Sequence, residues 1–328
     1  MKIAFFSRRS ASSTASEPLR RAEPPRSVRA TPLTAAFAPY VPLTAATPAA
    51  RGRLAFYLLR PASATDALIA ETCARPMASL VEALRDGRAR LHEMAGLHET
   101  EVENLTDTDL FAQAGDTIRG GWMDRTLAVD VVVPPSRRAR PRRLGLRAFC
   151  LEPGGGWRLM RDEREVSRAF GVLAMADQAG QETAAATAQW PAQAMARRFA
   201  DLIERDAQAL GVACAIDGVL REAHVYATPT MFRQLWPQLL NEHLAALLEE
   251  CAAVRGGDIG TALPPAPEAV AAWLEKTRRG RHVAQALTAR VTLTACEGND
   301  GTVSLETLDT AQGNMCIHRW VVAGGERR

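Results

Sequence analysis

The chain has 328 residues, of which 47% are hydrophobic and 23% charged, values typical of a globular protein with a substantial core. No apolar run reaches the ~18 residues that a membrane-spanning helix requires, so we expect no membrane partner. Residues 1–52 carry eight basic and two acidic side chains, a charge of +6 that leaves −3 for the rest of a chain whose total is +3. A nucleic-acid partner is therefore not expected, because the excess positive charge is confined to one end.

The cysteines and histidines show none of the spacings that hold metals or disulfides. The six cysteines are scattered without a CxxC pair, and the six histidines form no HxH or HExxH pattern. Most of the cysteines lie in apolar runs, where a thiol behaves as a small hydrophobic group. We therefore predict no disulfide framework, no metal, no cofactor and a reducing, cytoplasmic location.

Residues 1–52 are rich in Ala, Ser, Thr, Pro and Arg. Such a segment buries too little apolar surface to offset the entropy lost on ordering, so the prediction is a disordered tail. An organelle transit peptide shares this Arg- and Ser-rich, acid-poor composition and stays open as an alternative. The apolar start is too short for a secretory signal, which needs an apolar core of ~7–15 residues.

Between residues 54 and 151 the pattern predicts mostly short strands. LAFYLLRP at 54–61 is rich in strand-forming residues and is closed by a proline. Residues 127–133 alternate with period two, as a half-buried strand does. Further strands are predicted at 88–94, 100–104, 110–114 and 144–151, and a short helix at 77–85. Short strands without intervening helices favour an antiparallel core.

The second half of the chain mixes helices with strands. Gln189–Leu210 carries one apolar stripe and predicts a helix, and Thr228-Pro229 caps and opens another, whose apolar positions continue to Cys251. Pro237 lies inside this second run and is expected to kink it or to mark a new start. A short helix follows Pro267, and closing strands are predicted at 288–296, 302–308 and 315–322.

The clearest local signal is the hairpin VACAI-DG-VLREAHVYA. Asp217-Gly218 stands between two strand-like runs and favours a type I′ turn, which needs positive φ at both central residues. The expected fold is α+β, with an antiparallel β-rich core at 53–157, 211–226 and 288–323 covered by helices at 189–210 and 229–253. We expect one domain over residues 53–328, because early and late strands share that core.

Several motifs resemble one prokaryotic family. ASLVEALRDGRARLHEM, ETEVENLTDTDLFAQAGDTIRGG, VVVPP and LRAFCLEPGGGW follow one another as in the ARG and Rhodanese-Phosphatase-superfamily-associated Protein domain. Downstream, GVACAIDGVLREAHVYATPTMFRQLWPQLLNEHLAALL resembles that family's hairpin and its LWPKLL helix. The resemblance is strongest over residues 53–255.

One motif departs from the family pattern, which typically reads G-E-E-L-x-G-A-K-Q-N-R. Gly115, Gly120 and Arg125 match it and Asp116 replaces a glutamate, but Trp122-Met123-Asp124 replaces Lys-Gln-Asn. The chain therefore resembles a divergent member. The family is named for gene neighbours that include ADP-ribosylglycohydrolases, so the resemblance implies an accessory or ligand-binding factor for ADP-ribose- or NAD-derived nucleotides. A degenerate enzyme of that pathway and a non-catalytic interaction module, binding a partner or a second copy through its helical face, are the alternatives.

The segment from Gly115 to Arg125 is the candidate site for an ADP-ribose- or nucleotide-like anion. Its glycines let the backbone come close to a ligand, and N–H groups with two arginines could hold a phosphate. A hairpin turn with solvated arginines has the same pattern, so both interpretations stay open. The loop lacks the terminal Gly-Lys-Ser/Thr of a P-loop. The candidate residues are Gly115, Asp116, Arg119, Gly120, Gly121 and Arg125.

Cys150 and Glu152 are the candidate catalytic residues and match the family's Cys-x-Glu. Two residues apart on a strand, their side chains face the same way. A thiolate nucleophile needs a nearby base or cation, and His224 and His318 could approach only through the fold. A buried strand cysteine is the favoured interpretation, with Glu152 placed to orient Arg125 through a bidentate pair.

Two further features have structural interpretations. The arginine-rich loop at 137–143 favours a solvated strand connector, because no aromatic residues interleave for base stacking. His243 lies on the apolar face of the helix predicted from Pro229 and is interpreted as a core residue with satisfied hydrogen bonds.

Overall fold

The structure of the chain is a computed structural model, and it confirms the predicted α+β class with antiparallel sheets. The prediction of a disordered tail, as far as it concerns residues 1–42, lies outside the described residues. A single domain over residues 53–328 stays a prediction. The structure describes residues 43–51, 53–63, 65–66, 75–93, 100–118, 125–127, 129–136, 142–146, 148–151, 157–158, 196–244, 247–248, 251, 263–276, 281–298 and 300–323.

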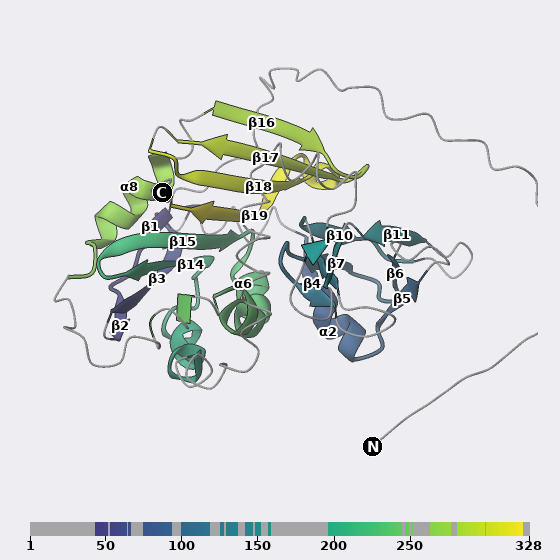
Figure 1. The fold of residues 1–328 in the computed structure, drawn as a ribbon, viewed down its shortest axis with the longest axis horizontal. Helices are drawn as coiled ribbons and strands as arrows, with labels where there is room; N and C mark the ends of the chain where they lie inside the picture. The colour runs from purple at the N-terminus through teal and green to yellow at the C-terminus, as the bar shows by residue number, and fades with distance from the viewer. Residues whose placement is uncertain are drawn as a thin grey trace, which may run out of the picture. The chain divides into compact units, whose positions relative to one another are not determined.

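The main sheet joins strands from both ends of the described chain (Figure 1). It is antiparallel throughout, and β2 (Ala49–Arg51) pairs additionally with β3. The late strands β15 and β19 are neighbours, and β3 hydrogen-bonds to β14 more than 150 positions further along the chain. In sheet order its strands are β1 (Leu43–Ala45), β3 (Leu54–Pro61), β14 (Gly211–Ile216), β15 (Val219–Tyr226), β19 (Met315–Val322), β18 (Val303–Asp309), β17 (Val291–Glu297) and β16 (Arg281–Ala286).

Three smaller sheets come from the segment between residues 77 and 158. Only the pairing of β4 with β7 is parallel among the described strands. The first sheet has the order β10 (Val131–Val133), β7 (Asp109–Ala112), β4 (Met77–Ser79); the second β11 (Arg143–Leu146), β6 (Thr100–Asn104), β5 (Ala89–Glu93); the third β13 (Trp157–Arg158), β12 (Ala148–Leu151), β9 (Arg125–Leu127), β8 (Thr117–Ile118).

The β14–β15 hairpin forms as predicted. Asp217 has φ 51° and Gly218 has φ 77°, the positive values that a type I′ turn requires. The guanidinium of Arg53 donates to both carboxylate oxygens of Asp217 and so ties the turn to the start of β3. The local sequence signal and the tertiary contact therefore agree at this turn.

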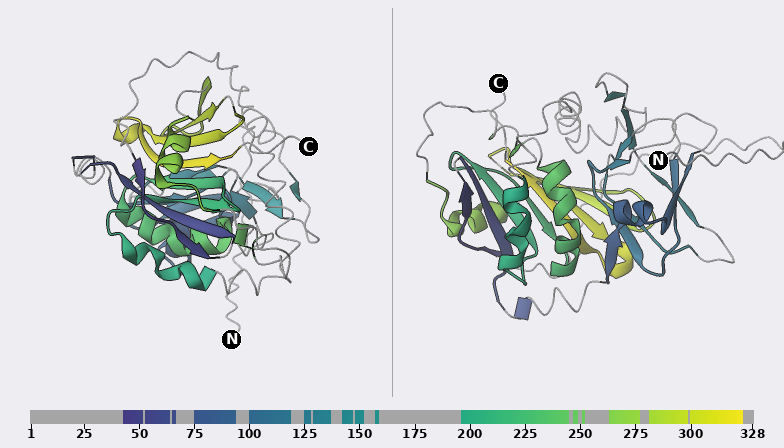
Figure 2. Two further views of the ribbon diagram at one scale, coloured as in Figure 1. Left: turned by 90° about the vertical axis from the view of Figure 1, so that its left-hand side faces the viewer. Right: turned by 90° about the horizontal axis from the view of Figure 1, so that it is seen from below.

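Helices cover both faces of the main sheet (Figure 2). Alternate residues of β3 divide between the faces: Phe56 packs with α6 (Pro229–Gln238) and η1 (Ala200–Arg205), whereas Tyr57 packs with α8 (Pro267–Lys276). Further helical segments among the described residues are α2 (Leu80–Arg85), η2 (Leu239–His243) and η4 (Thr310–Gln312). Within the part of the chain described here, no helix combines the length and apolar character needed to cross a membrane.

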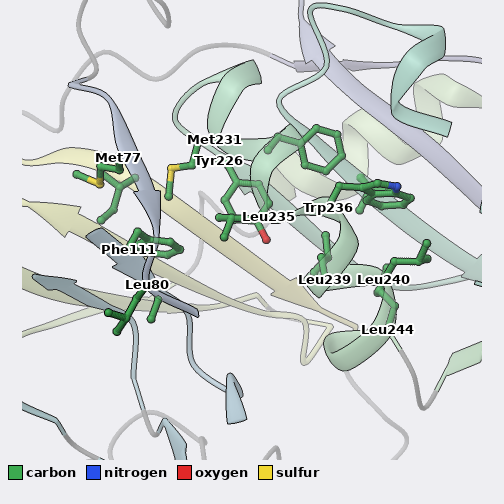
Figure 3. Close-up of a cluster of buried hydrophobic side chains, with 14 of the residues drawn as sticks. Met77, Leu80, Phe111, Tyr226, Met231, Leu235, Trp236, Leu239, Leu240 and Leu244 are labelled. Carbon is green, nitrogen blue, oxygen red and sulfur yellow. The ribbon is translucent and has the colours of Figure 1, made fainter. Parts of the chain in front are cut away.

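The apolar stripe of α6 and η2 is part of the chain's own core. In Figure 3, Met77, Leu80 and Phe111 lie to the left of Tyr226, Met231 lies next to it, and Trp236, Leu239, Leu240 and Leu244 lie to its right. Trp236 is almost fully buried, and its indole Nε1 donates to the carbonyl of Ala200 at 3.0 Å. The interaction-module alternative is not tested by this packing and stays a prediction. A homo-oligomer stays a prediction.

Two predicted strands are each divided between two sheets. The predicted strand 127–133 ends at Leu127 in the third small sheet and restarts at Val131 in the first, with Asp130 buried between them. The predicted strand 144–151 divides in the same way into β11 and β12. A period-two pattern describes each half correctly but does not reveal that the hydrogen-bonding partner changes.

Other predicted boundaries also shift. Residues 43–51, assigned from composition to the tail, form β1 and β2 because β3 supplies their hydrogen bonds. The predicted helix 77–85 begins only at Leu80, capped by the Ser79 hydroxyl, after three residues that pair as β4. The helix predicted at 189–210 ends earlier than expected, because η1 stops at Arg205. The backbone N–H of Leu210 already donates to Leu59 of β3. β16 was not predicted.

Gly211 allows β14 and β15 to approach closely. A Cβ added there would lie 2.1 Å from the backbone oxygen of His224, which cannot move without separating the strands. We expect Gly211→Ala to lower the free energy of unfolding by about 1–3 kcal/mol or more in urea titrations. The matched control is Gly145→Ala in β11, where nothing lies within 4 Å of the added atom. Equal stability of the two variants would contradict this account.

Candidate functional site

A group of ionisable side chains is buried where α6 and η2 meet the main sheet. We call His224, His243, His318, Asp116 and Asp130 the histidine–carboxylate cluster. Two aromatic rings complete its surroundings: Tyr226 stacks on His318 at 4.8 Å between centroids, and Trp320 lies parallel to His224 at 5.6 Å.

Strand register places these side chains in two rows on one face of the sheet. Tyr226, His318 and Thr307 stand opposite one another on β15, β19 and β18. His224 and Trp320, two residues away on their strands, form the adjacent row. Because side chains two residues apart on a strand point to the same face, the rows stack side by side under η2.

Asp130 is held by three donors in the interior. Its Oδ1 accepts from the backbone N–H of Ala114 at 2.7 Å. Its Oδ2 accepts from the hydroxyl of Thr307 and from Nδ1 of His318, both at 2.6 Å. Burial alone would raise the pKa of Asp130, but its pairing with His318 and the hydrogen bonds from Thr307 and Ala114 outweigh burial and lower the pKa below the ordinary value. Asp130 is therefore a carboxylate in the core.

The hydrogen-bonded chain continues from His318 to His224. Nε2 of His318 and Nδ1 of His224 are 3.2 Å apart, and this contact needs one donor and one acceptor. Burial lowers the pKa of His224 well below its ordinary value, and the neighbouring His318 and His243 lower it further. His224 is accordingly neutral at physiological pH, with its tautomer set by His318.

Asp116 and His243 form a second buried pair. Oδ1 of Asp116 lies 2.7 Å from Nε2 of His243, and Oδ2 accepts from the backbone N–H of Gln113 at 2.9 Å. Gly115 has φ 94°, and a Cβ added to it would lie 2.9 Å from Cε1 of His243. Glycine is thus required at position 115 both for the turn and for the close approach of the imidazole.

His243 reaches this position through a change of helical geometry. Leu244 donates to the carbonyl of Leu239, five residues back, and the side chain of Asn241 donates to the carbonyl of Pro237 at 2.6 Å. The π-helical turn η2 therefore follows directly on the proline that was expected to interrupt the helix. The side chain of His243 is 8% exposed and has a hydrogen-bond partner, as interpreted from the sequence.

Three buried atoms of this region have no hydrogen-bond partner within the part of the chain that the structure describes: Nε2 of His224, Nε2 of Gln113 and Nε1 of Trp320. His224 is 1% exposed and Gln113 2% exposed. The other end of the Gln113 amide, Oε1, accepts from the hydroxyl of Tyr226 at 2.7 Å. Since an unpaired buried polar group costs about 1–3 kcal/mol, three in one region are a marked departure from ordinary packing.

Among the described residues, no group of three or more histidine, cysteine and acidic side chains is arranged to hold a metal ion. The geometry gives a reason: ring nitrogens and carboxylate oxygens of the histidine–carboxylate cluster are directed at one another. The arrangement is instead suited to holding and moving protons.

The structure describes only part of the predicted ligand site. Gly115 and Asp116 form the turn against His243, and their role in binding an anion stays a prediction. The backbone of Arg125 lies in β9 directly opposite Cys150 of β12, but their side chains are outside the described residues. Four further candidates also lie outside: Arg119, Gly120, Gly121 and Glu152.

Sequence reasoning missed the histidine–carboxylate cluster as a unit. Asp130 was predicted only as part of the strand 127–133, and His224 and His318 were considered only as distant partners for Cys150. The sequence held only a modest indication of the cluster. His224 and Tyr226 are two residues apart within one apolar strand, and His318 and Trp320 are two residues apart within another. Nothing in the sequence indicated that these pairs face Asp130.

The fold and the site together define an α+β protein with a buried histidine–carboxylate cluster. Residues 43–173 match the family model of the ARG and Rhodanese-Phosphatase-superfamily-associated Protein domain, which confirms the resemblance for this segment. Asp116 and Asp130 lie within the match, whereas the three histidines of the cluster come from residues beyond it. Comparison with curated proteins finds no match, and comparison with solved structures finds none either.

The neutral state of His224 makes stability depend on pH. The unfolded chain binds a proton at this histidine below about pH 6.5, whereas the folded chain does not, so stability is complete above that pH and falls as the pH decreases. We expect His224→Gln to reduce this slope by up to about 1.4 kcal/mol per pH unit in urea unfolding at pH 7.5, 6.5 and 5.5. His282→Gln, at an exposed position on β16, is the control. An unchanged slope in His224→Gln would contradict a neutral buried His224.

Proposed function

We infer that the protein is a ligand-binding factor for an ADP-ribose- or NAD-derived nucleotide, bound at the segment that begins with Gly115 and Asp116. The matched domain is named for its association with ARG and with the rhodanese-phosphatase superfamily, which supports a role beside such proteins. The earlier resemblance gives the nucleotide class.

The single observation that carries the proposal is the anchoring of this segment on the histidine–carboxylate cluster. The backbone N–H of Gly115 donates to the carbonyl of Leu127 at 2.8 Å, and the N–H of Leu127 donates to the backbone carbonyl of Asp116. The Asp116 carboxylate is hydrogen-bonded to His243. The start of the segment is therefore fixed beside buried polar atoms that can hydrogen-bond a ligand. Pre-organised backbone of this kind lowers the entropic cost of binding.

Differential scanning fluorimetry with ADP-ribose, NAD and AMP tests the proposal. A ligand at ten times its dissociation constant stabilises the folded state by about 1.4 kcal/mol, which raises Tm by about 2–4 °C for a domain of this size. We expect this shift with at least one of the nucleotides and not with inorganic phosphate at the same ionic strength.

Arg125→Ala is the deciding variant, because the guanidinium is predicted to pair with the ligand phosphate. We expect the variant to lose most of the shift. Arg143→Ala is the matched control, since Arg143 is exposed in β11 and its guanidinium lies 3.9 Å from the Glu101 carboxylate. No shift with any nucleotide at millimolar concentration, or equal shifts in the two variants, would refute the proposed site.

A further inference from the structure

The histidine–carboxylate cluster contains more ionisable groups than stability alone explains. Replacing buried ion pairs by apolar side chains of similar volume is often neutral or stabilising, because charges lose hydration when they are buried. Here the carboxylate of Asp130 uses three donors, and the chain of bonds that it starts ends on a ring nitrogen without a partner. Perturbed, coupled groups of this kind concentrate at sites of acid–base chemistry.

The series of hydrogen bonds from Asp130 through His318 to His224 determines which ring nitrogens carry protons. Because Asp130 is ionised, Nδ1 of His318 carries a proton and donates it to the carboxylate. When His318 is neutral, its Nε2 accepts from Nδ1–H of His224, and Nε2 of His224 then has a bare lone pair. This atom is an acceptor, whereas the unpartnered buried atoms on Gln113 and Trp320 carry N–H groups. A hydroxyl group can donate to the lone pair of His224 and has its own lone pairs for an N–H donor.

We propose that His224 is an acid–base residue that exchanges a proton between its Nε2 and a hydroxyl group, with His318 and Asp130 as its positioning residues. In the step, the hydroxyl O–H bond breaks, its electron pair stays on oxygen, and the proton forms a new N–H bond at Nε2. The proton on Nδ1 of His224 passes to Nε2 of His318.

The transfer leaves the positive charge on His318 and not on His224. His224 ends neutral in its other tautomer, and the new imidazolium lies 2.6 Å from the Asp130 carboxylate. This removes the main obstacle to proton uptake at a buried imidazole, because the charge settles beside its counter-ion. Water can supply the hydroxyl, and so can a ribose; the second source rests on the proposed nucleotide function.

The first measurement is the tautomer of His224 in the wild-type protein, by two-dimensional ¹H–¹⁵N correlation of the histidine rings. We expect Nδ1 protonated and Nε2 bare at neutral pH, and a proton found on Nε2 would overturn the proposal. No nucleotide enters this measurement, so its outcome does not depend on the proposed function. Addition of ADP-ribose then separates the sources: a change in the Nε2 resonance assigns the hydroxyl to the nucleotide, and no change assigns it to water.

The second measurement is the reactivity of Nε2 toward diethyl pyrocarbonate, mapped by mass spectrometry. Nε2 attacks a carbonyl carbon, an N–C bond forms, ethyl carbonate leaves, and the Nδ1 proton passes to His318. We expect carbethoxylation of His224 to slow at least about tenfold in Asp130→Asn, which corresponds to loss of one charge-assisted interaction. Thr307→Val is the matched control, because it removes a donor to the same carboxylate oxygen but keeps the charge.

The outcomes are decisive in either direction. Slowing in Asp130→Asn with little change in Thr307→Val supports the relay, provided that both variants retain the wild-type far-ultraviolet circular dichroism. Equal rates in wild type and Asp130→Asn, or an unmodified His224 under conditions that modify the exposed His282, would overturn it. If Asp130→Asn does not fold, His318→Gln interrupts the same chain without removing the carboxylate, and the same slowing is expected.

Discussion

The buried carboxylate of Asp130 is the constraint on which the arrangement of the chain's parts depends. It accepts hydrogen bonds from Ala114, in the connection between β7 and β8, from Thr307 on β18 and from His318 on β19. A buried carboxylate is tolerated only when its lone pairs are satisfied, so these three segments must meet at one point. The division of the predicted strand 127–133 follows from this. A half-buried strand would turn the Asp130 side chain to solvent, whereas here the side chain points into the interior, so the strand is interrupted at this residue.

A second charged contact joins the same two parts of the fold. The guanidinium of Arg290 donates to both oxygens of Asp109 on β7 and to both oxygens of Asp309 on β18, at 2.6–2.8 Å. Burial raises the pKa of Asp309, but the hydrogen bonds and charge of Arg290 outweigh burial and lower it overall. The first small sheet is thus held against the main sheet by directional contacts as well as by the apolar core of Figure 3.

The matched family segment and the rest of the chain contribute different halves of the site. The segment 43–173 supplies the carboxylates, and the strands and helix beyond it supply the histidines. The cluster needs both halves: Asp130 is hydrogen-bonded to His318, and His318 is hydrogen-bonded to His224. The cluster is therefore a property of the assembled fold, and a motif confined to either segment does not reveal it.

The sequence by itself determined the α+β class, the type I′ turn at Asp217-Gly218, the cap at Thr228 and the interruption near Pro237, because these depend on local backbone preferences and on periodicity. Only the tertiary structure decided that β3 pairs with β14, that residues 43–51 join the sheet, and that Asp130 lies beside His318. Strand pairing and burial depend on residues more than a hundred positions away. A period-two pattern specifies which side chains share a face, but not which carboxylate that face will meet.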